Sequence, residues 1–140
     1  MRYPAAMRAT ETDIAWFREL LAPLGRIEAR RMFGGTGLYA ADAIVALEIE
    51  GVLYLKTDAT TRDRFRHAGG RPFAYDNGAR EVETSYWTPP DEAMDSADAM
   101  APWAWLAREA ALRAGAKKAS KRTRTAAPAR PAARPRRTSP

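Results

Sequence analysis

Three glycines close together, Gly34, Gly35 and Gly37, are the residues in this sequence that most resemble a phosphate-binding loop. Such a loop needs the spacing GxGxxG or a Gly-Lys-Ser/Thr motif, and it opens directly into a helix whose amides hold the phosphate. Neither motif is present, and the residues after Gly37 are typical of a strand. We therefore interpret the glycines as a turn or bulge that lets the chain bend between two strands.

Two adjacent arginines, Arg30 and Arg31, precede Met32 and Phe33. Arginines bind phosphate groups and aromatic rings stack on bases, so this set is one candidate contact with nucleic acid. The alternative, which we favour, is an edge strand in which one arginine is solvated and the other pairs with an acid, while Met32 and Phe33 belong to the core. Both arginines remain possible surface contacts. Trp105 joins them, because it falls off the apolar stripe of its helix and is expected to be partly exposed.

The other reactive side chains do not indicate a catalytic site. The chain has no cysteine, which excludes disulfides, thiolate nucleophiles and cysteine-based metal sites. The single histidine, His67, stands beside Arg64 and Arg66, which disfavour the charged imidazole, and it has no neighbouring carboxylate to orient it. Ser85 lies in a strand-like segment without a visible base. Acids cluster where helices begin, which capping explains. We expect no enzymatic activity, no cofactor and no metal.

The strongest charge signal is a basic tail, residues 115–140, with nine Lys or Arg residues and no acid. The whole chain has 23 basic and 17 acidic residues, so residues 1–114 carry 14 and 17 and have a net charge of −3. We expect the tail to be disordered and to bind nucleic-acid phosphates weakly, without sequence preference. A solubilising low-complexity extension is the alternative. The cations are Lys117, Lys118, Lys121, Arg122, Arg124, Arg130, Arg134, Arg136 and Arg137.

Three helical regions are expected between a flexible lead-in (1–9) and the tail, within one domain at 10–114. The first begins at Thr10 or Thr12 and ends before Gly25. A middle helix runs from Asp58 or Thr60 to about residue 68. C-terminal helices follow from about residue 88 up to residue 115, and Pro102 is expected to mark a helix start or a kink.

The strands are expected to form an antiparallel sheet of about four to five strands in a meander, which gives an α+β fold with the helices packed on it. Apolar runs at 27–33, around residues 38–39 and at 43–49 are separated by turn residues, and 81–87 alternates as a strand. Residues 71–80 are expected to be a loop or partial strand. A two-residue turn at Glu50-Gly51 pairs Ile49 with Val52, although a bulge would shift this register by one. The apolar face that it predicts, opposite Glu48, holds Val45, Leu47, Ile49, Val52 and Tyr54.

The chain has no apolar run of the length that spans a bilayer, and its first residues lack the apolar region of a secretory signal. We therefore expect a soluble, cytoplasmic protein that does not bind membranes.

Six segments of the sequence occur in an order that is specific as a set. They are RRMFGGTGLY (30–39), LYLKTD (53–58), TRDRF (61–65), AGGRPFAY (68–75), SYW followed by Pro89 (85–89), and WLAREAALRA (105–114). Together they resemble the N-terminal domain of the TfoX/Sxy family of bacterial competence regulators, in a stand-alone form. The likeness covers residues 12–114.

The resemblance implies an α+β domain on an antiparallel sheet and a role linked to DNA transformation competence. Full-length members act as co-regulators with the cyclic-AMP receptor protein and carry a second, helical C-terminal domain. Here the chain passes into the basic tail instead, so the competence role is an expectation for the N-terminal domain alone. The family offers no established catalytic residues to place on this chain.

The favoured hypothesis is a non-enzymatic regulatory protein. It would contact a protein partner, either transcription machinery or a receptor-type regulator, and its tail would add non-specific affinity for nucleic acid. One alternative is a small-ligand or enzymatic domain with a pocket between sheet and helices. Another is an oligomerisation module that uses a sheet edge or Trp105; the sequence leaves the oligomeric state open.

Overall fold

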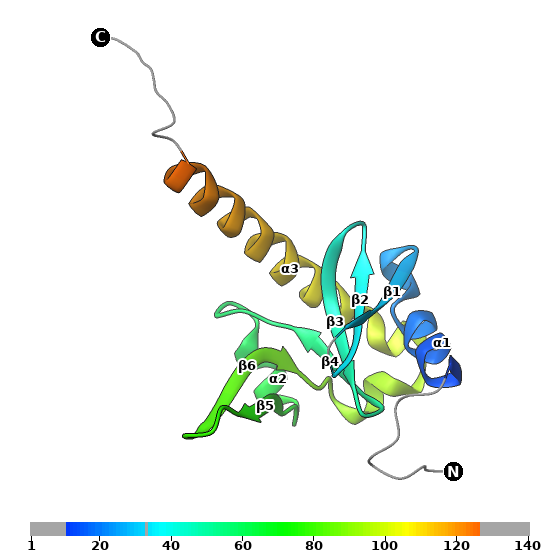
Figure 1. Ribbon diagram of the computed structural model, residues 1–140. Coiled ribbons are helices and arrows are strands. Elements are labelled where there is room, and N and C mark those ends of the chain that lie inside the picture. Colours follow the sequence, from blue (N-terminus) through cyan, green and yellow to red (C-terminus); the bar gives the residue numbers. More distant parts are fainter. Residues whose placement is uncertain (1–10, 33, 127–140) are drawn as a thin grey trace.

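The computed structural model describes residues 11–32 and 34–126, so the expected lead-in and the end of the basic tail lie outside the described residues. The elements follow the expected order of helix, strands, helix, strands and helix (Figure 1). They are α1 (Glu11–Leu20), the short 3-10 helix η1 (Ala22–Leu24), β1 (Ile27–Met32), β2 (Gly35–Ala40), β3 (Ala43–Ile49), β4 (Val52–Lys56), α2 (Arg62–His67), β5 (Pro72–Asp76), β6 (Glu81–Trp87), the 3-10 helix η2 (Asp91–Asp95) and α3 (Ala97–Ala126).

The six strands form one antiparallel sheet in the order β1-β2-β3-β4-β6-β5. This confirms the α+β class. The sheet has more strands than expected, because residues 72–76 form a strand that pairs with β6, with a register shift between Pro72 and Ala74, rather than a loop. β4 and β6 share only two residue pairs, so the β5–β6 hairpin projects away from the meander of β1 to β4 (Figure 1).

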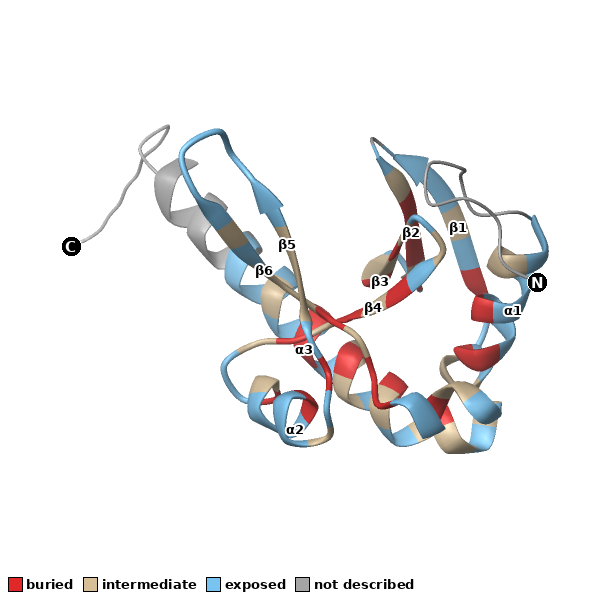
Figure 2. Ribbon diagram, turned by 90° about the horizontal axis from the view of Figure 1, so that it is seen from below, coloured by how far each residue is buried: buried red, intermediate tan, exposed pale blue. Residues whose placement is uncertain are grey.

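The helices lie along one side of the sheet (Figure 2), and the hydrophobic core lies between them and that side. α3 packs on β3 and β4, while α1 and η1 close the end near β1. Burial of these apolar side chains is the main favourable term in folding. The larger core residues are Phe17, Leu20, Leu21, Ile27, Leu38, Val45, Leu53, Leu55, Phe65, Trp87 and Met100.

Two tight turns set the register of the central strands. Ala41 and Asp42 join β2 to β3, and Glu50 and Gly51 join β3 to β4; all four residues have positive φ, which is the geometry of a type I′ hairpin turn. Ile49 therefore faces Val52 and Leu47 faces Tyr54, so the expected register is confirmed. The carboxylate of Glu48 accepts a hydrogen bond from the amide of Gly51 at 2.9 Å. This bond satisfies part of an acidic side chain that is only 3% exposed.

The apolar face that the sequence predicts for β3 and β4 is mostly the side away from the helices. Leu47, Ile49 and Tyr54 are half-buried and Val52 is 41% exposed, whereas the alternate residues face the core and are buried. We call the side opposite the helices the open face. Its residues, placed by strand register and side-chain contacts, are Met32, Tyr39, Ile44, Leu47, Ile49, Val52, Tyr54, Lys56, Phe73 and Tyr86.

α3 differs from expectation at both of its ends. It begins at Ala97 and contains Pro102, so this proline does not mark the helix start. It also continues through Gly115 to Ala126, so the first part of the basic tail is helical rather than disordered. Ala, Lys and Arg favour helices, and cations stabilise the negative end of the helix dipole. Pro128, just beyond, is unfavourable within a helix. Among the described residues, no helix combines the length and apolar character that a membrane crossing requires.

An ion pair ties α3 to the start of α2. Arg113 Nε donates to Asp58 Oδ2 at 2.6 Å, and Asp58 Oδ1 accepts from the amides of Thr60 and Thr61. Asp58 thus makes the helix-entry contacts expected of it. The hydrogen bond from Arg113, followed by the smaller contributions of its positive charge and of the two amides, lowers the pKa of Asp58.

Replacement of Asp58 by Asn should lower the free energy of unfolding at neutral pH by about 0.5 kcal/mol, because solvent screens the pair. The folded-state pKa is below the unfolded value, so the carboxylate stabilises the fold above the unfolded pKa of 3.8 and loses this effect as the pH falls through the folded-state pKa. Urea unfolding at pH 7 and at successively lower pH should show the difference from wild type shrinking. Glu19→Gln, at an exposed position of α1, is the control. An equal loss of unfolding free energy in that variant would contradict the role given to the Asp58–Arg113 pair.

Candidate functional site

The glycine cluster serves the sheet rather than a ligand. Gly34 has a φ of +85° in the connection between β1 and β2, and Gly35 and Gly37 lie within β2. A Cβ at Gly35 would collide with the backbone carbonyl oxygen of Glu48 on β3. No helix begins after these glycines, so the arrangement of a phosphate loop is absent from this segment. The interpretation as a bend between strands agrees with the structure.

Arg30 and Arg31 point to opposite sides of β1 and do not form a joint cluster. Arg30 pairs with Glu28 at 2.8 Å, lies 3.7 Å from Asp42, and has its guanidinium 4.3 Å from the centre of the Tyr39 ring. Its hydrogen bond raises the pKa of Arg30 and lowers the pKa of Glu28. Arg31 is exposed. One arginine is therefore paired and the other solvated, as favoured from the sequence.

The expected burial of the two residues after Arg31 has separate outcomes. Met32 is 37% exposed, so its assignment to the core was wrong; the β1–β2 register places it on the open face. Phe33 lies outside the described residues.

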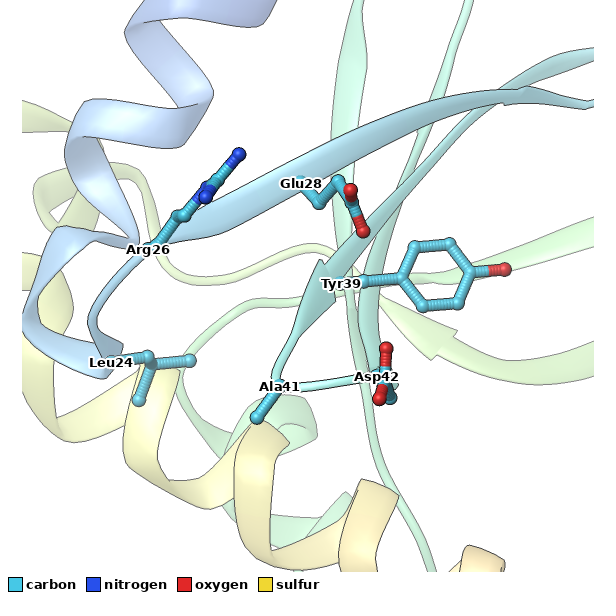
Figure 3. Close-up of a pocket in the computed structure, with 6 residues that line it drawn as sticks. All are labelled: Leu24, Arg26, Glu28, Tyr39, Ala41 and Asp42. Carbon is cyan, nitrogen blue, oxygen red and sulfur yellow. The ribbon is translucent and has the colours of Figure 1, made fainter.

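A hollow of about 310 Å³ lies beside this ion pair (Figure 3). It is formed where η1, the start of β1 and the β2–β3 turn meet. Its charged members are surface groups: Glu28 and Asp42 have side chains 53% and 94% exposed. Such groups are well solvated, unlike the buried acids of a catalytic pair. The lining residues are Leu24, Arg26, Glu28, Tyr39, Ala41 and Asp42.

Lys56 has a more unusual environment at the end of β4. Its Nζ donates to Ser85 Oγ at 2.8 Å and lies 5.0 Å from the centre of the Tyr86 ring. Burial lowers the pKa of Lys56, and the nearby positive charge of Lys118 lowers it further, against a smaller opposing effect of Asp58. The ion pairs found among the described side chains do not include Lys56. It is a partly desolvated cation near a second cation.

The expectation that Ser85 lacks a base partner was wrong, because Lys56 lies within hydrogen-bond distance. A Ser–Lys pair can supply a nucleophile and a base, but catalysis also needs donors for a developing oxyanion. Ser85 lies within β6, and its carbonyl oxygen accepts from the amide and hydroxyl of Thr57. Neither Ser85 nor Lys56 lines the hollow of Figure 3. The hydrogen bond between Lys56 and Ser85 joins the end of β4 to β6.

The remaining candidates lie apart from one another. Trp105 on α3 is 44% exposed, as expected, with Arg108 5.6 Å from its ring centre. His67 is exposed at the end of α2. Within the described residues, no group of three or more His, Asp or Glu side chains is arranged to hold a metal ion.

The tail cations divide into three groups. Lys117 and Lys118 are exposed on α3. The next three, Lys121, Arg122 and Arg124, lie on the helical backbone of α3. The last four, Arg130, Arg134, Arg136 and Arg137, lie outside the described residues.

The sequence reasoning did not identify Lys56, Tyr39, Tyr54 or Tyr86 as site residues. A signal was present, because β3 and β4 are apolar on both faces, as is typical of strands that are covered on two sides. The cross-strand neighbour of Lys56 is 30 positions away in the sequence, and only the register shows that Tyr86 lies beside it.

Replacement of Gly35 by Ala should destabilise the fold by about 1–3 kcal/mol, because the new methyl group meets backbone of β3 that cannot move without breaking the strand pairing. Gly37→Ala is the matched control. There, a Cβ would meet the ends of three flexible side chains, Met32, Tyr39 and Ile44, which can shift. Urea unfolding should show a large loss for Gly35→Ala and a small one for Gly37→Ala; equal losses would contradict this account.

Comparison with known proteins places these features in a family. Residues 19–111 match the TfoX N-terminal domain. A stretch of 59 residues is 36% identical to the DNA transformation protein TfoX1 of Aliivibrio fischeri (strain ATCC 700601 / ES114). That stretch is 42% of this chain and 28% of the relative, so the chain matches under a third of the relative's length. Because the domain match covers well over half of the chain, this protein belongs to the TfoX N-terminal domain family.

Proposed function

We propose that this protein is a non-enzymatic, cytoplasmic regulator linked to DNA transformation competence. The observation that carries the proposal is the family match over residues 19–111, together with a relative named as a DNA transformation protein. The described side chains support a binding role: the exposed surface combines apolar residues with a basic helix end, and the Arg30–Glu28–Asp42 group is a solvated ion-pair set.

The regulator acts through two kinds of contact. A protein partner, either transcription machinery or a receptor-type regulator, binds an exposed apolar surface that includes Trp105. Trp105 and Leu112 are seven positions apart, so they lie on the same side of α3, and both are exposed. The basic tail adds affinity for nucleic acid without sequence preference, since its cations attract phosphate.

Replacement of the nine tail cations by Gln in the full chain should abolish retention on duplex DNA at low salt. Each lost phosphate contact reduces the slope of log K against log salt by about 0.9. The thermal transition should change little, because Lys117 and Lys118 are exposed and the core lies elsewhere. Undiminished duplex binding by this variant would overturn the role of the tail.

Replacement of Trp105 by Ala should weaken capture of the transcription partner by about tenfold or more, as for an aromatic residue that anchors an interface. Trp16→Ala on α1 is the matched control, because Trp16 is exposed to a similar degree, at 42%. Affinity capture from the native host with the full chain and with each variant, followed by quantitative mass spectrometry, measures how much partner each variant retains. Equal capture by Trp105→Ala and wild type would remove Trp105 from the contact.

Deletion of the gene should lower the frequency of DNA transformation in a competent host, and the wild-type chain supplied in trans should restore it. The Trp105→Ala chain should restore it less well, because the partner contact is weakened. A deletion strain that transforms at the wild-type frequency would contradict the competence role, whatever the chain binds in vitro.

A further inference from the structure

The open face presents aromatic rings from four different strands. Tyr54 on β4 and Phe73 on β5 are in contact, with ring centres 5.3 Å apart. Strand register places Tyr39 on β2 and Tyr86 on β6 on the same face, and burial raises the pKa of Tyr86. Ile44 and Leu47, both half-buried, lie beside them on the same side of β3. The helices lie on the other side of the sheet (Figure 2), and Tyr39, Tyr54 and Tyr86 are half-buried.

Two cations lie against these rings. Arg30 is 4.3 Å from the centre of Tyr39, and Lys56 is 5.0 Å from the centre of Tyr86. Glu28, the acid beside Arg30, is already paired with it. Lys56 has no ion pair among the described side chains. Arg113 on α3 pairs with Asp58, two residues after Lys56, so the helix that carries Lys117 and Lys118 passes the same end of β4, where several cations favour an anion.

We propose that the open face binds single-stranded nucleic acid, with bases stacked on Tyr39, Tyr54 and Tyr86 and a phosphate held by Lys56 next to the basic end of α3. Aromatic rings interleaved with cations are the recurring means of single-strand binding, because every base has a face that stacks. A duplex keeps its bases stacked inside and offers only phosphates to such a surface. An apolar protein partner would bury the ammonium group of Lys56 further without supplying an acid to pair with it, which is costly.

This site on the sheet is distinct from the tail. It rests on the proposed function in one respect, namely that the protein binds nucleic acid. Binding through the tail should occur with any phosphate backbone and should increase with the number of tail cations. Binding through the open face should prefer single strands, because it depends on stacking against the tyrosine rings. This preference should therefore persist at salt concentrations that weaken binding through the tail.

The test is fluorescence anisotropy with a labelled single strand of about 12 nucleotides, and with a duplex of the same sequence, at near-physiological salt. The variants are Tyr39→Leu, Tyr54→Leu and Lys56→Gln in the full chain, with Trp16→Leu and Arg64→Gln as controls for a lost ring and a lost charge away from the open face. Each open-face variant should lose about tenfold in single-strand affinity, and the tyrosine variants should change duplex affinity less than about twofold. The controls should match wild type.

Unchanged single-strand affinity in all three variants would overturn the proposal, as would equal losses for single strand and duplex in the tyrosine variants. If tail neutralisation abolishes all binding while the tyrosine variants behave as wild type, the tail role stands and the open-face site fails. Ultraviolet cross-linking of the wild-type chain to a bromouracil-containing single strand provides a readout that needs no variant. Cross-links on peptides of β2, β4 or β6 support the site, and cross-links confined to the tail overturn it.

Discussion

The packing of α3 on β3 and β4 is the contact on which the other features depend. The helix presents mainly small side chains to the sheet, so its backbone comes close and the contact is sensitive to any added volume. The buried residues of α3 are Met100, Ala104, Ala107, Ala110 and Ala111. Small residues bury little area each, so the contact needs the large core side chains of the sheet opposite, including Leu38 and Leu55. Once α3 is fixed there, Arg113 reaches Asp58 and the basic end of the helix has a defined position relative to Lys56.

The same packing leaves one side of the sheet without a helix. β3 and β4 are apolar on both faces, yet only the face that carries Leu53 and Leu55 is covered by the core. The open face therefore keeps half-buried aliphatic and aromatic side chains that pack on one another rather than on a helix. Such a surface costs solvation free energy when it is bare, and contiguous exposed apolar patches often mark sites of interaction. The cations beside its rings distinguish it from a surface suited only to another apolar face.

Much of the fold could be predicted from the sequence, because local signals decide it. The strands at 43–49 and 81–87 and the turn at Glu50-Gly51 follow from alternation and turn chemistry. Which side of β3 faces the helices could not be predicted, because Glu48 lies buried on the core side, opposite Leu53, where its carboxylate accepts from the amide of Gly51. The tail was expected to be disordered because its residues cannot bury a core. Its first part is helical nevertheless, because a helix that continues an existing one avoids the cost of nucleation. Lys56 was missed because its neighbours come from β6 and α3, which are distant in the sequence.

The excess positive charge of this chain lies in the tail, so the position of Lys56 relative to the tail affects how nucleic acid could bind the sheet. Residues 1–114 carry a net charge of −3, so the folded domain as a whole does not attract nucleic acid. A tail that holds a phosphate backbone loosely would raise the local concentration of nucleic acid at the sheet, which converts a weak second contact into an intramolecular one. This gain requires the two binding elements to lie close together. The Arg113–Asp58 ion pair holds α3 beside the end of β4, two residues from Lys56, and Lys117 and Lys118 follow Arg113 on the same helix.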